Sequence, residues 1–191
     1  MSPRTAEKFK EIREEKKRLI MKVGLELFAN EGFHSTSISK IAKAADISKG
    51  LMYNYFESKD DLLKQIAFQG INDIFETFDS NKDGVITKEE FIYFIKELIP
   101  LTKSQMNFWK LYFALMTQPH VLTALGDDFV TSFEYNFKII ADYFNKKGFE
   151  DGYTETRLFI AMLDGIMLNY IVDPEHFPFE KVIDRIIKLY A

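Results

Sequence analysis

The chain has 191 residues, of which 47% are hydrophobic and 28% charged, so it is long enough to bury one large core or two small ones. It contains no cysteine, which excludes a disulfide scaffold, a thiol nucleophile and any cysteine-ligated zinc or iron–sulfur site. Its net charge of −4, taken as a total, argues against nucleic acid as a partner.

The N-terminal part of the chain is basic in spite of this total. Residues 1–70 carry 13 Lys and Arg against 10 Asp and Glu, whereas residues 71–100 carry 3 against 7. Residues 1–18 are highly charged and lack the apolar stretch of a signal peptide, and no apolar run reaches the roughly 18 residues that span a bilayer. We therefore expect a cytoplasmic protein, with any nucleic-acid surface at its basic end.

Helical periodicity dominates the first 78 residues. The spacing predicts a long helix over residues 7–30, with an apolar stripe that includes Ile20, Val23 and Leu27. Two short helices and a second long helix, over residues 58–78, follow it. The expected caps of these three helices are Thr36 or Ser37, Ser48 and Ser58.

The segment 36–56 places its two short helices on either side of a four-residue turn, residues 45–48. Helices this short are unstable alone, so we expect them to pack on the first helix as a three-helix unit, the geometry that offers a helix to the DNA major groove. The candidate base-reading residues are Ser39, Leu51, Tyr53 and Asn54. The candidate phosphate-binding and capping residues are Thr36, Ser37, Ser48, Lys49, Gly50, Tyr55 and Lys59. A three-helix bundle without a ligand fits the spacing as well.

The run from Ser37 to Leu63 closely resembles the DNA-binding region of tetracycline-repressor (TetR) family regulators. The residues that carry the resemblance are Ile41-Ala42, Ser48-x-Gly50, Tyr53-x-x-Phe56 and Ser58-Lys59, and it extends over residues 13–70. One departure is Asp46, because the family usually has glycine at this point of the turn. Since Asp tolerates the left-handed conformation better than most residues, we expect a small energetic cost and an intact fold.

The resemblance implies an all-α, homodimeric transcriptional regulator. Residues 1–58 would then be a helix-turn-helix DNA-binding domain, and residues 59–191 a helical regulatory and dimerisation domain with a small-molecule pocket. Residues 158–168 and 179–189 are similar to the last two helices of the family, which form its dimer interface. An amphipathic core helix would show the same pattern. This function requires no cofactor.

A second motif lies after the 58–78 helix, where Asp79–Glu90 matches the twelve-residue EF-hand loop position by position. The candidate Ca²⁺ ligands are Asp79, Asn81, Asp83, the carbonyl of Val85, and Glu90. Hard oxygen ligands at this spacing suit Ca²⁺ better than Mg²⁺, and an ion here is expected to stiffen the joint between two helices and so bias the spacing of the DNA-reading heads. The alternative is a polar inter-helix loop in which Asp and Gly serve turns and caps.

The remaining chain predicts five helices, about nine in all: one from residue 91 that ends at Pro100, then 103–117, 122–147, 154–172 and 179–190. Aromatic side chains at helical spacing in two of them are either core or the lining of a cavity for an apolar or aromatic effector. The candidate pocket residues are Phe108, Trp109, Tyr112, Phe113, Met116, Phe133 and Phe137. The spacing favours core for most of them.

No phosphate-binding glycine loop, nucleophile elbow or HExxH motif is present, so we expect no enzymatic activity and no catalytic residue. The prediction is a ligand-responsive repressor that binds a palindromic double-stranded DNA operator as a homodimer and does not associate with membranes. The competing interpretation is a calcium-responsive helical interaction module in which the helix-turn-helix has only a structural role.

Overall fold

The computed structural model describes residues 3–79, 81–116 and 121–191, and these residues form nine α-helices, as the periodicity predicts. The chain divides into two compact units, Met1–Phe68 (unit 1) and Gln69–Ala191 (unit 2). The division falls inside α4 (Lys59–Phe78), because Leu62 and Ile66 in its first turns pack against Gly24 of the first helix.

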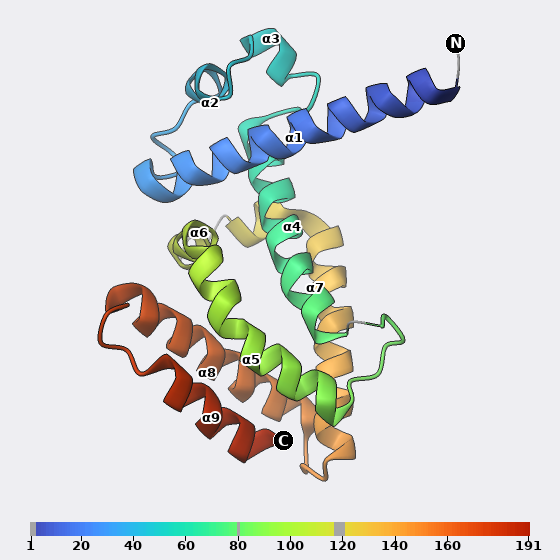
Figure 1. The fold of residues 1–191 in the computed structure, drawn as a ribbon, viewed down its shortest axis with the longest axis vertical. Coiled ribbons are helices and arrows are strands. Elements are labelled where there is room, and N and C mark those ends of the chain that lie inside the picture. The colour runs from blue at the N-terminus through green and yellow to red at the C-terminus, as the bar shows by residue number, and fades with distance from the viewer. Residues whose placement is uncertain (1–2, 80, 117–120) are drawn as a thin grey trace. The chain divides into compact units, whose positions relative to one another are not determined.

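Unit 1 is built from α1 (Pro3–Glu31), α2 (Ile38–Ala44), α3 (Lys49–Met52) and the beginning of α4. Helix α2 packs on α1, and α3 packs on α2 (Figure 1). Helix α3 has only four residues, although a helix reaching Phe56 was the expectation; the chain continues from it in hydrogen-bonded turns that still bury Phe56. The apolar core of unit 1 contains Ile20, Phe28, Ile41, Ala42, Met52, Phe56, Leu62 and Leu63.

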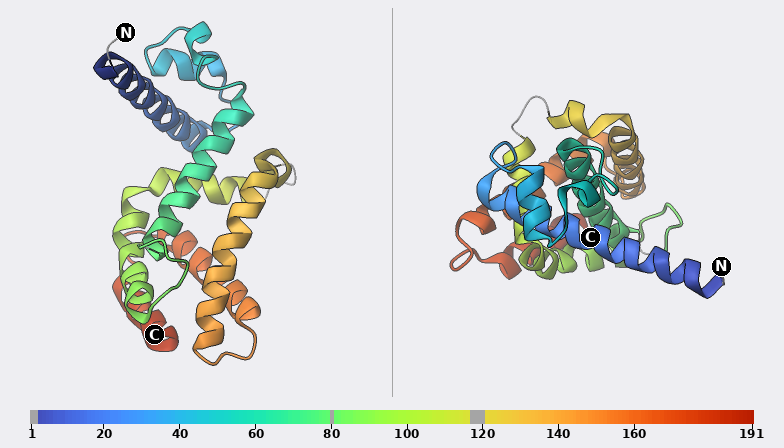
Figure 2. Two further views of the ribbon diagram at one scale, coloured as in Figure 1. Left: turned by 90° about the vertical axis from the view of Figure 1, so that its right-hand side faces the viewer. Right: turned by 90° about the horizontal axis from the view of Figure 1, so that it is seen from above.

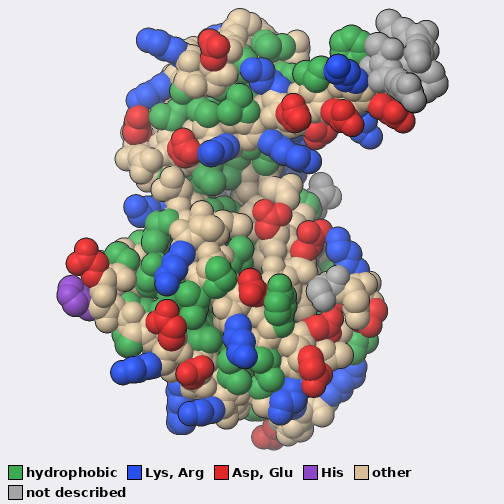
Figure 3. All heavy atoms as spheres, viewed as in Figure 1, with side chains coloured by type: hydrophobic (Ala, Val, Ile, Leu, Met, Phe, Trp, Pro, Cys, Tyr) green, Lys and Arg blue, Asp and Glu red, His purple; other side chains and the backbone are tan. Residues whose placement is uncertain are grey.

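Unit 2 contains the end of α4 and α5 (Lys88–Ser104), α6 (Met106–Met116), α7 (Val121–Lys146), α8 (Gly152–Val172) and α9 (Phe179–Tyr190). Helices α7 and α8 pack on each other along their length, and the chain reverses direction between them in residues 147–151 (Figure 2). Helix α9 packs against α5. The face of unit 2 seen in Figure 3 carries both signs of charge, interspersed with apolar side chains.

Aromatic rings hold unit 2 together. Phe78 stacks on Phe94 with ring centroids 3.8 Å apart, and Phe91 stacks on Tyr143 at 4.7 Å. The Phe159 ring lies edge-on to Phe78 and is tilted against Phe91. Such offset and edge-to-face pairs add stabilisation to the burial of apolar area, and these contacts involve four of the 19 phenylalanines in the chain.

Two further helices, α5 and α7, depart from expectation. Helix α5 continues through Pro100 to Ser104, because Leu98 and Thr102 on either side of the proline remain buried and outweigh one lost backbone hydrogen bond. Helix α7 is broken at Gly126, which has a φ of 76° and a ψ of 174°. The expected end of the 103–117 helix lies outside the described residues. Within the described ranges, no helix is both long and apolar enough to cross a membrane.

Candidate functional site

Local side-chain chemistry sets the geometry of the helix-turn-helix. Ser37 caps α2 by accepting a hydrogen bond from the Lys40 amide, and Ser48 caps α3 by accepting one from the Leu51 amide at 3.1 Å. Between them, Asp46 has a φ of 51°, in the left-handed region where glycine is usual. The departure from glycine therefore leaves the turn intact, as expected.

Burial separates the two faces of α2 and α3. Ile41, Ala42 and Met52 face the core, whereas Tyr53 is 50% exposed and Leu51 37% exposed. The other exposed candidates on this side of unit 1 are Ser37, Ser39, Ser48, Lys49, Gly50 and Asn54, with Tyr55 partly exposed. The four candidate base-reading residues Ser39, Leu51, Tyr53 and Asn54 are thus all exposed to solvent.

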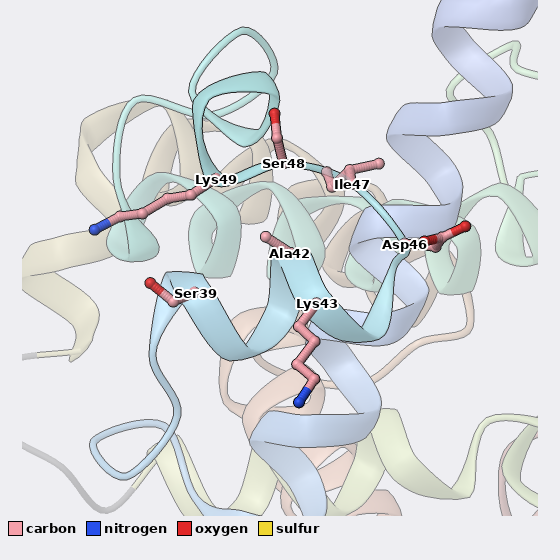
Figure 4. Close-up of a pocket in the computed structure, with 7 residues that line it drawn as sticks. All are labelled: Ser39, Ala42, Lys43, Asp46, Ile47, Ser48 and Lys49. Carbon is pink, nitrogen blue, oxygen red and sulfur yellow. The ribbon is translucent and has the colours of Figure 1, made fainter.

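A groove of about 430 Å³ lies between α2 and α3. Figure 4 shows Ser39 and Lys49 extending to the same side of it, while Asp46 points to the opposite side. The Lys49 ammonium is a donor suited to a phosphate oxygen, and the Ser39 hydroxyl can donate to or accept from a base edge.

Lys59 holds the connection between α1 and α2. Its ammonium donates to the carbonyls of Phe33 at 2.8 Å, Thr36 at 3.0 Å and His34 at 3.5 Å, and lies 4.3 Å from the centroid of the Phe33 ring. The hydroxyl of Thr36, a residue only 1% exposed, donates to the carbonyl of Gly32 at 2.9 Å. Any phosphate contact from Lys59 or Thr36 therefore competes with these internal bonds.

The role of Arg13 was not predicted. Its guanidinium donates to the carbonyl of Asn54 at 2.9 Å and lies 5.1 Å from the centroid of the Tyr55 ring. Arg13 precedes the buried Ile20 by seven residues, two helical turns, and so shares its face of α1. That register was a usable signal that Arg13 reaches across to the segment after α3.

The loop 79–90 has the turns that an EF-hand needs, with Lys82 at a φ of 58° and Gly84 at 76°. One carboxylate oxygen of Asp79 and the amide oxygen of Asn81 both accept from the Asp83 amide, at 3.2 and 2.9 Å. Asp79 and Asn81, the candidate ligands at the first and third positions of the loop, therefore share one hydrogen-bond donor. Ser80, at the second position of the loop, lies outside the described residues.

Glu90, the last candidate ligand, lies in the capping box of α5. Its Oε2 accepts from the amide of Thr87 at 3.0 Å and from the Thr87 hydroxyl at 2.8 Å, while the Glu90 amide donates to that hydroxyl. Across the described parts of the chain, no three acidic or histidine side chains approach closely enough to hold a metal ion. The loop oxygens are thus engaged with loop amides and with the start of α5.

Unit 2 contains a cavity of about 790 Å³ between α6, α7 and α8. A smaller cavity of about 70 Å³ adjoins it, because both are lined by Tyr112, Phe133, Ile160 and Asp164. Of the predicted pocket residues, Tyr112, Met116, Phe133 and Phe137 line the larger cavity and Trp109 the smaller. Phe108 and Phe113 line neither of the two; Phe108 is buried against Gly70.

Asp164 is the acidic residue at the boundary of the two cavities, and the sequence reasoning missed it. Its carboxylate accepts a hydrogen bond from the Tyr112 hydroxyl at 3.5 Å. Burial raises the pKa of Asp164 to about 6, although the Tyr112 bond opposes this shift. Burial and the charge of Asp164 also raise the pKa of Tyr112 above its usual range. A lone acid within the apolar run 158–168 was the available signal.

Comparison with known proteins places both motifs in described families. Residues 20–66 match the family described as "Bacterial regulatory proteins, tetR family", and residues 70–98 match the EF hand domain. The chain is 53% identical over 49 residues to the uncharacterized HTH-type transcriptional regulator YuxN of Bacillus subtilis, a segment that is 26% of this chain and 17% of that protein.

Two longer alignments extend beyond the helix-turn-helix. The fatty acid metabolism regulator protein of Bacillus subtilis is 28% identical over 100 residues, covering 52% of this chain and 49% of that protein. The HTH-type transcriptional regulator UidR of Escherichia coli is 27% identical over 121 residues, covering 61% and 60%. The chain therefore spans less than two thirds of the length of these relatives.

Solved structures share the fold over most of the chain. FadR from Bacillus halodurans has a TM-score of 0.75 at 16% identity, covering 92% of this chain and 94% of that chain. FadR from Bacillus subtilis, in complex with stearoyl-CoA, has a TM-score of 0.72 at 17% identity, covering 91% and 96%. At these identities the likeness shows the fold alone.

Proposed function

Since the chain belongs to the TetR family of helix-turn-helix transcriptional regulators, we propose that it binds a palindromic operator as a homodimer and represses transcription until a small molecule releases it. The observation that carries the proposal is the exposed face of α2 and α3. Ser39, Lys49 and Leu51 are exposed on these helices, and Tyr53 and Asn54 are exposed directly after α3, while Ile41, Ala42 and Met52 are buried.

Each exposed residue has a proposed role on DNA. Tyr53 and Asn54 read base edges, with Ser39, and Leu51 contacts a thymine methyl. Lys49 and the hydroxyls of Ser37 and Tyr55 contact phosphates and set the register of unit 1 on the duplex. The caps and internal bonds of Ser48, Thr36 and Lys59 hold the backbone that presents them.

A gel-shift titration with DNA flanking the protein's own gene tests this function. We expect a discrete complex that weakens as salt rises, because phosphate contacts release counterions. Asn54→Ala is expected to change which operator variants are preferred, whereas Lys49→Ala weakens binding to all variants and flattens the salt dependence. A uniform loss with Asn54→Ala on every sequence would remove Asn54 from the reading residues.

Homodimerisation is proposed through α8 and α9. Exposed apolar side chains support this assignment: Leu158, Leu168, Val172 and Leu189 lie at the solvent surface of these helices. Analytical ultracentrifugation checks it, and Leu168→Glu is expected to shift the protein from dimer to monomer and to abolish binding to a palindrome. A monomeric wild type would contradict this part of the proposal.

The effector site of the proposed regulator is the cavity of about 790 Å³ in unit 2. Its mostly apolar lining suits an apolar or aromatic small molecule. The FadR structure from Bacillus subtilis contains stearoyl-CoA, which supports effector binding in a protein of this fold.

A second candidate function is Ca²⁺ binding by the 79–90 loop, supported by the EF-hand match over residues 70–98 and by the backbone turns at Lys82 and Gly84. Asp79, Asn81, Asp83, Glu90 and the Val85 carbonyl would hold the ion. Calorimetry with Ca²⁺ on the wild type and on Glu90→Gln tests it. Binding heat lost in the variant is expected; no heat above buffer in the wild type would leave the loop as a polar connection.

A further inference from the structure

The acidic residue between the two cavities of unit 2 points to the chemistry of the effector. Building on the effector-controlled function proposed above, we propose that the cavity binds an organic cation, a positively charged nitrogen or phosphorus centre carrying aromatic groups, with Asp164 as its counter-charge and Tyr112 and Phe133 against its apolar body.

Asp164 has no counter-charge among the described residues. Among the described residues, its one hydrogen bond comes from Tyr112 at 3.5 Å, the outer limit for such a bond, and no Lys or Arg forms a salt bridge with it. Because burial raises its pKa only to about 6, the carboxyl is largely ionised at neutral pH. A carboxylate in apolar surroundings without a cation is costly, and a bound cation would offset that cost.

The aromatic part rests on the rings that share the cavity with Asp164. Tyr112 and Phe133 line both cavities, and Phe137 and Tyr153 line the larger one. The Phe137 ring already accepts a cation, since the Arg157 guanidinium lies 5.8 Å from its centroid. Ring faces attract cations most strongly where water is excluded, so a carboxylate among aromatic rings suits a large organic cation.

The exposed charges that line the larger cavity contribute little to the choice between a cation and an anion. Lys138, Arg157 and Glu134 also line the larger cavity, but all three residues are exposed. Their charges are solvated without a ligand, so an anionic headgroup there gains little. Asp164 differs because it is partly buried, and burial raises its pKa to about 6. The partly buried charge that lacks a counter-charge in the cavity is therefore a negative one.

The chain supplies its own probe of the site. Trp109 is its single tryptophan, 3% exposed, and lines the smaller cavity. Its indole Nε1 is buried and has no hydrogen-bond partner among the described residues. Trp109 fluorescence therefore reports ligands that enter beside Asp164.

The test compares two ions of nearly the same shape and opposite charge, tetraphenylphosphonium and tetraphenylborate, titrated in sodium buffer against Trp109 fluorescence in the full-length protein. We expect saturable binding of tetraphenylphosphonium at least about tenfold tighter than that of tetraphenylborate. Sodium laurate provides a third arm, an anion with an aliphatic body. Tighter binding of either anion would overturn the inference.

Two variants locate the charge. Asp164→Asn keeps the shape of the side chain and removes its charge, and is expected to weaken tetraphenylphosphonium about tenfold or more while leaving tetraphenylborate unweakened. Arg157→Gln, the control at the same cavity, is expected to leave tetraphenylphosphonium binding unchanged or stronger. Thermal melts check that both variants are folded. Equal affinity of wild type and Asp164→Asn for the cation would refute the assignment of Asp164.

The operator gel shift separates this inference from the function on which it rests. A salt-sensitive DNA complex without any tetraphenylphosphonium binding leaves the regulator standing and overturns the cation site. Cation binding that depends on Asp164 but leaves the DNA complex unchanged supports the cation site and contradicts effector control. Release of DNA by tetraphenylphosphonium from the wild type, and not from Asp164→Asn at the same concentration, supports both.

Discussion

The Arg13 guanidinium donates a 2.9 Å hydrogen bond to the backbone carbonyl of Asn54. This bond ties α1 to the turn that follows α3, between residues 41 positions apart in the chain. Because the Asn54 side chain is exposed and is a proposed base-reading group, Arg13 fixes the backbone from which that group projects. We therefore expect Arg13 to act as a positioning residue for DNA recognition.

Replacing Arg13 tests this role. Arg13→Ala is expected to lower the free energy of unfolding by about 1 kcal/mol, because a charge-assisted hydrogen bond and a contact with the Tyr55 ring are lost. It should also lessen discrimination among operator variants in competition gel shifts. Arg18→Ala removes the same charge from an exposed position of α1 and should leave discrimination intact. If both variants lost discrimination equally, the cause would be the change in net charge and not the bond from Arg13 to Asn54.

Substitution of Lys59 and substitution of Lys49 are expected to change different properties of the protein. Lys59→Met removes donors to three carbonyls and should lower the free energy of unfolding by about 2 kcal/mol. Lys49→Met is at an exposed position and should leave stability within about 0.5 kcal/mol, while reducing the salt dependence of DNA binding. Urea unfolding followed by circular dichroism gives the first quantity. An unchanged urea midpoint for Lys59→Met would show that its internal hydrogen bonds do not stabilise the fold, and Lys59 would again be a candidate phosphate-binding residue.

The pKa of Asp164, raised by burial to about 6, predicts a pH-dependent stability. The folded protein holds this proton to a higher pH than the unfolded chain does, so ionisation opposes folding, and stability is lost as pH rises from about 4 through 6. Asp164→Asn should therefore be more stable than the wild type at pH 7, by about 2 kcal/mol, with the difference shrinking towards pH 4.

Urea unfolding of both proteins between pH 4 and 8 measures this difference. The other charged groups that line the cavity, Glu134, Lys138 and Arg157, are present in both proteins, so their own titrations cancel in the comparison to first order. Tyr112 stays neutral in this range, because its pKa is raised. A difference that does not change with pH would mean that Asp164 is not the titrating group.

Two glycines in helices predict opposite outcomes for the same substitution. A Cβ on Gly70 would lie 2.0 Å from a ring carbon of Phe108, so Gly70→Ala should destabilise unit 2 by about 1–3 kcal/mol unless Phe108 moves. A Cβ on Gly165 meets nothing within 4 Å, and Gly165→Ala should stabilise α8 by about 0.5–1 kcal/mol. Thermal unfolding of the two variants makes the comparison; a stabilised Gly70→Ala would show that the ring yields freely.

Sequence reasoning succeeded where local chemistry determines structure. The caps Ser37, Ser48 and Ser58 each accept a helix amide, and Asp46 takes the left-handed conformation expected of it. These features depend on neighbours within four residues, which a sequence displays directly. The apolar stripe of α1, which includes the buried Ile20, follows from the helical period for the same reason.

The features that the sequence did not predict depend on contacts between residues distant in the chain. The bond from Arg13 to Asn54, the three carbonyls bound by Lys59 and the burial of Asp164 beside Tyr112 join positions 23 to 52 apart. Which aromatic residues of α6 line a cavity also depends on distant contacts. Phe108 faces Gly70, whereas Tyr112, one turn later, faces the cavities. At Pro100 a local rule failed, because tertiary burial on both sides of the proline outweighed it.

The capping box at the start of α5 sets up a competition for one carboxylate. Glu90 already bonds the amide and hydroxyl of Thr87, so an ion that drew Glu90 away would fray the first turn of α5 as it bound. Loss of such a cap costs about 1 kcal/mol, which corresponds to roughly a fivefold weaker ion affinity. The loop would then act as a low-affinity sensor, and α5 would begin more firmly without the ion than with it.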